Sequence, residues 1–250
     1  MLSFASQLVP FYIIEISFGS ILGKYNIIGK FDNVPMISLK EAKINKLYCR
    51  VLKRSFDIIF SLCIIIFVMS WLLPIMAFII KLTSNGPIFF KQERWGKEGK
   101  AFTIIKFRTM VCNSEDVDEK GNYKQAIKND PRITKIGKYL RKTNLDEMPQ
   151  FFNVLIGNMS VVGPRPHPVL LNMECKDVIE NYMLRHLIRP GITGWAQVNG
   201  FRGETKCDIK LMQRRIDCDL WYIENWSFVL DIQIILMTIG KMIRGDPHAY

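Results

Sequence analysis

The chain has 250 residues, nearly half of them hydrophobic, and its 34 lysines and arginines against 23 acidic residues give a net charge of +11. That length suits one sizeable domain together with membrane elements. A basic surface suits nucleic acid, anionic lipid or phosphorylated substrates. The sequence has no DNA- or RNA-binding motif, so nucleic acid is not an expected partner. The six cysteines show no CxxC pair, which argues against a disulfide framework or zinc site and predicts reduced, cytosol-facing thiols.

Residues 1–45 carry short apolar runs broken by Gly, Asn and Asp, which predict a strand-and-loop fragment without a core of its own. From Ile58 to Ile80 there follow 23 residues without a charge, more than the roughly 18 typical of a membrane helix. We therefore expect residues 46–83 to enter a membrane. Pro74 bends the helix axis, and basic residues flank both ends. A re-entrant helix fits both facts, and an ordinary kinked transmembrane helix is the alternative.

The remaining part, residues 84–250, begins with the turn signal SNGP and the predicted strands PIFFKQ and AFTIIKFRTM, which the turn WGKEGK separates. Residues 113–130 are polar and predict a loop. A basic amphipathic helix is expected from Pro131 to Arg141, on lipid headgroups or, alternatively, with its basic face in solvent. Residues 207–223 predict a second amphipathic helix. Residues 226–243 are too polar to span a bilayer and are expected at its interface or in the core.

Two adjacent carboxylates, Asp146 and Glu147, lie between basic residues that include Arg141 and Arg165. Adjacent carboxylates repel each other and need cations nearby, and arginines suit the planar oxygens of phosphate. The pattern therefore indicates a metal-assisted reaction on a phosphate ester. A capping box, with Asn144 as N-cap and Glu147 three residues later, is a compatible alternative.

Other chemistries find weaker support in the sequence. Two DxD patterns match nucleotide-sugar glycosyltransferases, although such short matches are more typical of solvated charges; they are Asp116 with Asp118, and Asp217 with Asp219. His167 and His186 are candidate acid–base groups, but single histidines are more often structural. The sequence contains no GxGxxG, Walker A, GxSxG or HExxH motif.

From about Leu52 to Tyr250 the sequence resembles the monotopic polyprenyl-phosphate phosphoglycosyl transferases, the bacterial sugar transferases that initiate surface-glycan assembly. The resemblance rests on long motifs in one order: LKRSFDIIFS, GPIFFKQERWG, KFRTM, DPRITKIGKYLRKTNLDEMPQFFNVLIGNMSVVGPRPHPV and RPGITGWAQVNGFRGET. The last motif, with YIENWSFVLDI, is most similar to the undecaprenyl-phosphate glucose phosphotransferases. Residues 1–45 resemble the end of a regulatory domain in longer members, so we expect a preceding membrane bundle to be missing.

The resemblance implies transfer of a hexose 1-phosphate from a UDP-sugar to undecaprenyl phosphate with release of UMP, as the first membrane step of exopolysaccharide, capsule or O-antigen synthesis. Glucose is favoured and galactose is next. It implies a ping-pong route with Asp146 as nucleophile, Glu147 assisting, and both carboxylates binding Mg²⁺. By motif position, the implied phosphate contacts are Lys106, Arg108, Arg141, Arg165 and Arg189. The implied helix break is at Leu73 and Pro74, where relatives often have Ser-Pro.

The expected fold is α+β and mostly helical, with a re-entrant membrane helix, interfacial amphipathic helices and a small β element. The catalytic domain, residues 84–250, is expected on the cytosolic face of the bacterial inner membrane. Its expected partners are the UDP-sugar, undecaprenyl phosphate and membrane lipid, and a homo-oligomer is left open. One alternative is a metal-dependent glycosyltransferase that uses a DxD pair and releases UDP. The other is a non-catalytic basic scaffold on anionic membrane.

Overall fold

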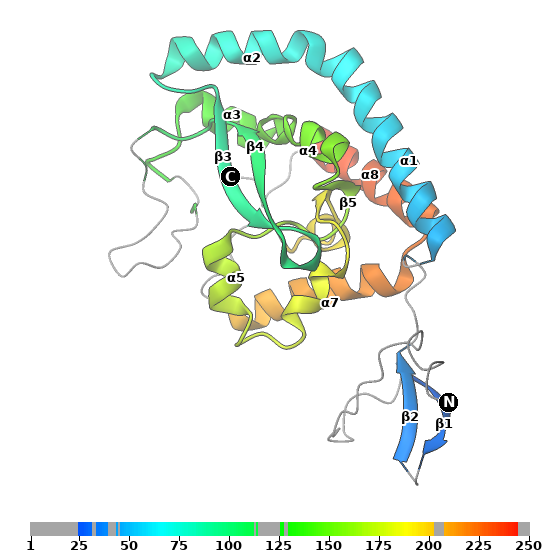
Figure 1. Cartoon of the computed structure of the whole chain (residues 1–250). Helices are drawn as coiled ribbons and strands as arrows, with labels where there is room; N and C mark the ends of the chain where they lie inside the picture. The colour runs from blue at the N-terminus through cyan, green and yellow to red at the C-terminus, as the bar shows by residue number, and fades with distance from the viewer. Residues whose placement is uncertain are drawn as a thin grey trace, which may run out of the picture. The chain divides into compact units, whose positions relative to one another are not determined.

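The computed structural model describes residues 25–31, 34–39, 44, 46–112, 114, 126–127, 130–202 and 208–244. The chain divides into two compact units, Met1–Glu41 and Ala42–Tyr250 (Figure 1). In the first unit, β1 (Tyr25–Phe31) and β2 (Val34–Leu39) pair antiparallel. The second unit carries the long helix and every candidate site residue that the structure describes.

The long apolar segment forms one continuous helix of 37 residues, Leu47–Thr83, with a mean hydropathy of 2.7 in its most apolar window. It is long and apolar enough to cross a membrane. It consists of α1 (Leu47–Ile64), one π turn (Ile65–Met69) and α2 (Ser70–Thr83). The axis changes direction between α1 and α2 (Figure 1).

The departure from α-helical geometry does not lie at Leu73 and Pro74, where we expected the break. Pro74 lies inside α2, which continues to Thr83, and the irregular turn ends at Met69. Proline has no N–H to donate and its ring crowds the preceding turn. A π turn on the N-terminal side is one way in which a helix accommodates such a misfit without ending.

The predicted strands PIFFKQ and AFTIIKFRTM both form, as the antiparallel pair β3 (Phe89–Trp95) and β4 (Ala101–Phe107). A parallel pair of short strands follows, β5 (Ser160–Val162) with β6 (Gly191–Thr193). The remaining α-helices are α3 (Lys135–Lys142), α4 (Gln150–Ile156), α5 (Val169–Cys175), α6 (Trp195–Val198), α7 (Ile209–Asn225) and α8 (Phe228–Arg244). Mostly helical structure with small sheets confirms the coarse fold class.

The helix expected from Pro131 begins only at Lys135, so that predicted start is wrong. Asp130 accepts hydrogen bonds from the backbone N–H (2.9 Å) and the guanidinium of Arg132, which holds this segment in a turn. Thr134 then caps the helix, because its hydroxyl accepts from the N–H of Gly137 at 3.0 Å. The amphipathic helix expected at 207–223 forms as α7, shifted by two residues, and most of residues 226–243 form α8.

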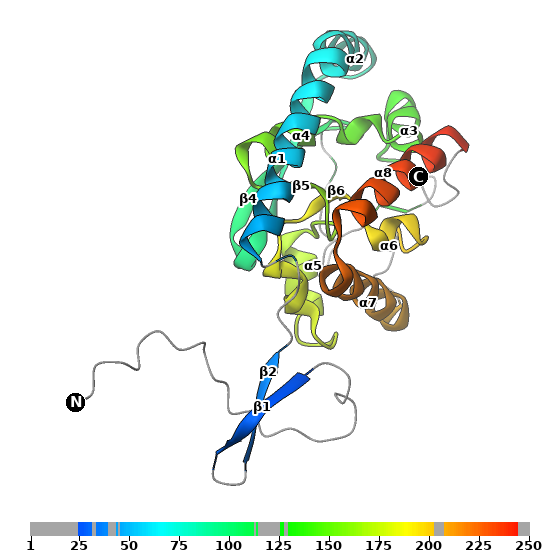
Figure 2. The ribbon, with the colours of Figure 1, turned by 90° about the vertical axis from the view of Figure 1, so that its right-hand side faces the viewer.

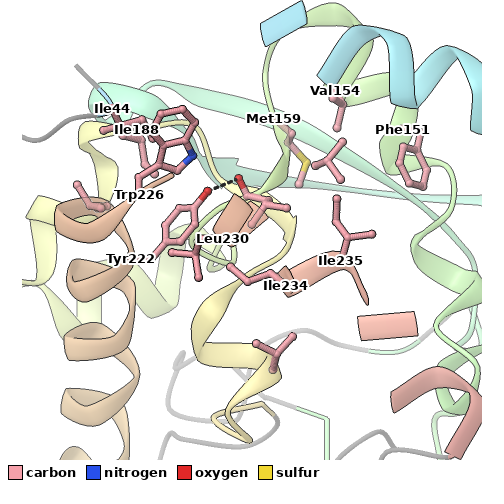
Figure 3. Close-up of a cluster of buried hydrophobic side chains, with 14 of the residues drawn as sticks. Ile44, Phe151, Val154, Met159, Ile188, Tyr222, Trp226, Leu230, Ile234 and Ile235 are labelled. Atoms are coloured by element: carbon pink, nitrogen blue, oxygen red, sulfur yellow. Dashed lines mark hydrogen bonds between the residues drawn. The ribbon is translucent and has the colours of Figure 1, made fainter. Parts of the chain in front are cut away.

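The main hydrophobic core joins α1, α4, β5, α7 and α8 (Figure 3). It is built around buried side chains such as Val154, Met159, Tyr222 and Ile234. Helix α8 lies against α6 and the β5–β6 pair (Figure 2), and buries Ile234 and Ile235 while exposing Val229, Leu236 and Ile243. This segment therefore packs in the core on one face and keeps an apolar face uncovered within the described structure.

Buried polar contacts fix the long helix to this core. The Lys53 ammonium lies 2.7 Å from the Asp231 carboxylate of α8, which also accepts hydrogen bonds from Tyr222 (2.6 Å) and Trp226 (3.1 Å). One turn further along α1, Asp57 accepts from the Ser160 hydroxyl (3.0 Å) and the Val161 N–H (2.9 Å) of β5. The long helix and the rest of the second unit thus form one packed body.

Candidate active site

Asp146 and Glu147 lie on a short 3-10 turn, Leu145–Glu147, between α3 and α4. The chain enters the turn through Asn144 in a left-handed conformation (φ 57°), and Pro149 leads into α4. Both carboxylates are buried, with 7% and 6% of each residue exposed. The predicted capping box is wrong: the Asn144 side chain makes no capping hydrogen bond and instead accepts from Arg202.

Glu147 faces two cations instead of a helix terminus. Its Oε1 lies 3.1 Å from the Lys106 ammonium, and Arg165 donates to both carboxylate oxygens, with 3.1 Å between Nη1 and Oε2. Burial by itself raises the pKa of Glu147, but Arg165 and Lys106 outweigh it and hold that pKa well below 4.5. A two-armed guanidinium contact and an ammonium stabilise a buried carboxylate far more than one backbone N–H does.

Asp146 lies in a different electrostatic environment from its neighbour. Burial, and then the Glu147 charge, raise its pKa above 3.8, against the opposing effect of Lys106 and Arg141. Its Oδ1 is buried and has no hydrogen-bond partner among the residues that the structure describes. The adjacent carboxylates therefore have separate properties: Glu147 is held ionised by fixed cations, whereas Asp146 keeps an oxygen available for a ligand.

The two carboxylates open into a cavity of about 930 Å³, a size that accommodates a nucleotide-sugar. Among the described residues its lining holds two carboxylates and ten lysines and arginines: Lys81, Lys91, Arg94, Lys106, Arg108, Arg132, Arg141, Arg165, Arg202 and Arg215. Phe89, Phe107, Met110 and other apolar residues line it as well. Such an excess of cations in a concave site attracts multiply charged anions.

Four of the five predicted phosphate contacts line this cavity, and they differ in what already holds them. Lys106 and Arg165 contact Glu147, and Arg141 donates from Nε to the Thr109 hydroxyl at 2.9 Å. The guanidinium of Arg108 instead donates to the carbonyls of Ser84 (2.8 Å) and Asn85. It therefore ties the end of α2 to the end of β4, next to the site.

Arg189, the fifth predicted contact, is not brought to the cavity. Its Nε donates to the Gly157 carbonyl at 2.8 Å, just beyond the C-terminal end of α4. Arg54 of α1 donates to the neighbouring carbonyls of Val154 (2.6 Å) and Leu155 (2.8 Å). The two arginines satisfy carbonyls that a helix terminus leaves unpaired.

Some cavity residues were not predicted individually: Arg94, Arg132, Arg202 and Arg215. Arg94 and Arg202 lie in the motifs GPIFFKQERWG and RPGITGWAQVNGFRGET, so motif membership was a usable signal for them. Arg215 lies on α7 within no such motif and is placed in the lining only by tertiary packing.

The DxD and histidine candidates take other places. Asp116 and Asp118 lie outside the described residues. On α7, Asp217 is exposed and bonds Gln213, whereas Asp219 is buried and pairs with Arg185, so the two carboxylates do not converge. His167 and His186 are buried, and burial first, then the nearby arginine, lowers the pKa of His186 to about 4. Neither histidine is poised for proton transfer near neutral pH.

The donor set fits Mg²⁺ at one carboxylate. Among the described residues no group of three or more His, Cys, Asp and Glu side chains is arranged to hold a metal. Mg²⁺ is commonly bound by one or two carboxylates together with substrate phosphates and water. Oδ1 of Asp146, which no described residue contacts by a hydrogen bond, can serve as such a ligand. Both oxygens of Glu147, the second predicted ligand, already bind cations.

Comparison with known proteins identifies the family of this chain. A sequence model described as "Bacterial sugar transferase" matches residues 48–245. A UDP-glucose:undecaprenyl-phosphate glucose-1-phosphate transferase of Klebsiella pneumoniae is 48% identical over 212 residues, covering 85% of this chain and 44% of the relative. An exopolysaccharide production protein PSS of Rhizobium leguminosarum bv. phaseoli is 47% identical over 199 residues, 78% of this chain and 97% of the relative. The chain spans less than half the length of the Klebsiella relative, and it belongs to the bacterial sugar transferase family.

Proposed function

We propose that this chain transfers a hexose 1-phosphate, with glucose the first candidate, from a UDP-sugar to undecaprenyl phosphate and releases UMP. The observation that carries the proposal is the buried Asp146, which lies in a strongly cationic cavity and has one carboxylate oxygen without a hydrogen-bond partner in the described part of the chain. The names of the relatives support the substrates, since the Klebsiella pneumoniae protein is called a UDP-glucose:undecaprenyl-phosphate glucose-1-phosphate transferase.

The proposed reaction has two displacements at one phosphorus atom. An Asp146 oxygen attacks the sugar-bearing phosphorus, and the bond from that phosphorus to the bridging oxygen breaks, so that UMP leaves with the bridging oxygen. An oxygen of undecaprenyl phosphate then attacks the same phosphorus. This forms the lipid-linked diphosphate and frees the Asp146 carboxylate. The acceptor phosphate is anionic at neutral pH and needs no general base.

The cations of the cavity supply electrostatic stabilisation in this scheme. Charge builds up on the departing UMP, and fixed guanidinium and ammonium groups offset it without reorganising. Glu147 holds Lys106 and Arg165 in place through its ion pairs. Its low pKa makes it a poor base, so its role is to orient these two cations. When bound at the Asp146 oxygen, Mg²⁺ offsets the charge of the diphosphate.

We further propose that the long helix is re-entrant, with both ends on the cytosolic face of the bacterial inner membrane. The bend between α1 and α2 and the apolar side chains that α1 and α2 expose support this arrangement (Figure 1). After replacement of the six native cysteines by serine, single cysteines near Lys46 and Lys97 should be labelled from the same side of sealed vesicles. Labelling from opposite sides would show a true span.

The reaction is tested with Asp146→Asn, which keeps the shape of the side chain but removes the nucleophilic charge. UMP release from UDP-glucose in the presence of undecaprenyl phosphate should fall to background. Asp217→Asn is the matched control, since Asp217 is exposed on α7 and outside the cavity. Mass spectrometry of wild-type protein quenched with donor alone should show a phosphosugar adduct on Asp146.

Three outcomes would contradict the proposal. Full activity of the Asp146→Asn variant would show that Asp146 is not the nucleophile. UDP as the nucleotide product, together with loss of activity in Asp217→Asn, would favour the metal-dependent glycosyltransferase. Salt-sensitive binding to anionic vesicles without any turnover of a nucleotide-sugar would favour the scaffold.

A further inference from the structure

A buried group of three charged residues borders the cavity, and one of them, Arg215, belongs to its lining. It consists of Arg185, Asp219 and Arg215, which we call the buried triad, and each residue is at most 4% exposed. Arg185 Nη2 lies 2.8 Å from Asp219 Oδ2. Arg215 lies four residues before Asp219 on α7, on the same helix face, and the Asp219 charge acts on both arginines. Asp219 comes from a DxD pattern for which the proposed reaction has no use.

The first arm of the triad reaches the segment that carries Arg165. Arg185 Nη2 donates to the backbone carbonyl of Arg165 at 2.6 Å, and Nη1 lies 2.6 Å from His167 Nδ1. A guanidinium can only donate, so this nitrogen of His167 accepts and the imidazole is neutral. Burial first, and then Arg185, lower the pKa of His167 well below 6.5, which is consistent with that neutral form.

The second arm reaches the segment that carries Arg202. Arg215 Nε donates to the backbone carbonyl of Phe201, the preceding residue, at 2.8 Å. Arg165 and Arg202 enter the cavity from these two anchored segments, and the positive charges of both act on Glu147. Burial first, and then Arg185, lower the pKa of Arg215 to about 10, so it stays a cation at neutral pH.

We propose that the buried triad positions Arg165 and Arg202, two of the arginines that line the cavity. Arg185 fixes Arg165 through its carbonyl, and Arg215 fixes Arg202 through the carbonyl of Phe201. Asp219 holds the two positioning arginines by its charge. A buried carboxylate keeps two guanidinium groups together that would otherwise repel each other. The inference concerns the site of the proposed function, and therefore rests on it.

A positioning role predicts a loss of catalytic rate that a purely structural role in stabilising the fold does not predict. A displacement of about 1 Å in a catalytic group can cost roughly 10²-fold in rate. Arg185→Lys keeps the positive charge next to Asp219 but loses the two-armed geometry that holds both Arg165 and His167. We expect kcat/KM for the UDP-sugar to fall by roughly 10²-fold in this variant.

The decisive measurement is a double-mutant cycle on the full chain in detergent or nanodiscs. If Arg185 acts through Arg165, then Arg185→Lys adds no loss once Arg165→Ala is present. In an Arg202→Ala background, the loss of kcat/KM caused by Arg185→Lys should multiply with that of Arg202→Ala, because Arg185 anchors the segment of Arg165 and not that of Arg202. A second, independent cycle pairs Arg215→Lys with Arg202→Ala. The test therefore remains possible if one of the lysine variants fails to fold.

Ile179→Val is the matched control for general softening of this region. It removes one methyl group from a buried side chain that packs in the same cluster as Tyr182 and Ile216, and an aliphatic side chain makes no polar contact with Arg185 or with either anchored carbonyl. The loss of kcat/KM in this control variant should multiply with the loss in Arg165→Ala. Its thermal unfolding temperature should be close to those of the lysine variants, so that equal destabilisation is compared. The proposal would be overturned if the losses multiply both for Arg185→Lys with Arg165→Ala and for Arg215→Lys with Arg202→Ala.

Affinity for UDP, measured by calorimetry on the same variants, separates this inference from the proposed function. The cycles can be read from these affinities as well as from UMP release. A wild-type chain that binds UDP but releases no UMP would contradict the proposed reaction. The positioning role of the triad would then stand or fall on the coupling seen in the affinities alone.

Discussion

Lys106 gives a pH-dependent prediction whose size follows from the structure. Its side chain is only 15% exposed, and burial lowers its pKa to about 8 although Glu147 lies 3.1 Å away. The proposed reaction needs this ammonium in its charged form, so we expect activity to be lost as the pH rises through that value. For a pKa of about 8, the protonated fraction falls roughly tenfold between about pH 7 and pH 9. We expect kcat/KM for UDP-glucose to fall by the same factor.

Lys106→Arg should abolish the decline between about pH 7 and pH 9, because a guanidinium is a much stronger base than an ammonium and keeps its charge over that range. In Lys106→Met, kcat/KM should be lower than in the wild type by about 10²-fold at neutral pH and should stay low at every pH. The reason is that a charge-assisted hydrogen bond to a buried carboxylate contributes roughly 1.5–3 kcal/mol. The assay is UMP release from pH 5 to 10, where kcat/KM reports groups of the free enzyme. Lys100→Arg, on an exposed side chain paired with Glu98, is the control and should keep the wild-type profile. The reasoning is refuted if Lys106→Arg retains the wild-type decline.

Other substitutions test separate parts of the structure. Arg189→Ala should leave KM for the donor within about twofold and lower the unfolding temperature, since Arg189 satisfies a carbonyl beyond α4 and does not line the cavity; a large rise in KM would place it in the site. Asp231→Ala should destabilise the folded chain by about 3–5 kcal/mol in chemical unfolding, because it leaves the Lys53 ammonium buried without its partner; an unchanged midpoint would contradict this. Chelation by EDTA should stop UMP release and added Mg²⁺ should restore it, whereas Asp146→Asn should not be rescued; full turnover in EDTA would remove the proposed metal.

The sequence by itself determined the features that depend on local pattern. The uncharged run from Ile58 to Ile80 can satisfy its backbone only as a helix in an apolar medium, and the structure has one continuous helix there. The turn WGKEGK between two β-rich runs was enough to place β3 and β4. The adjacent pair Asp146–Glu147 indicated the position of the candidate site, because two neighbouring carboxylates require cations and basic residues lie close to them in the sequence.

Only the tertiary structure decided what each charge faces. Glu147 had a suitable spacing for a capping box, yet Lys106 and Arg165 come from a distant strand and a later loop to bind its carboxylate. Arg189 and Arg108 looked alike as motif arginines, but one satisfies a carbonyl beyond α4 and the other holds the end of α2. Asp219 matched a metal motif and instead pairs with Arg185 from a segment outside α7. Long-range packing determines which partner a charged side chain meets, and spacing along the chain carries little information about that partner.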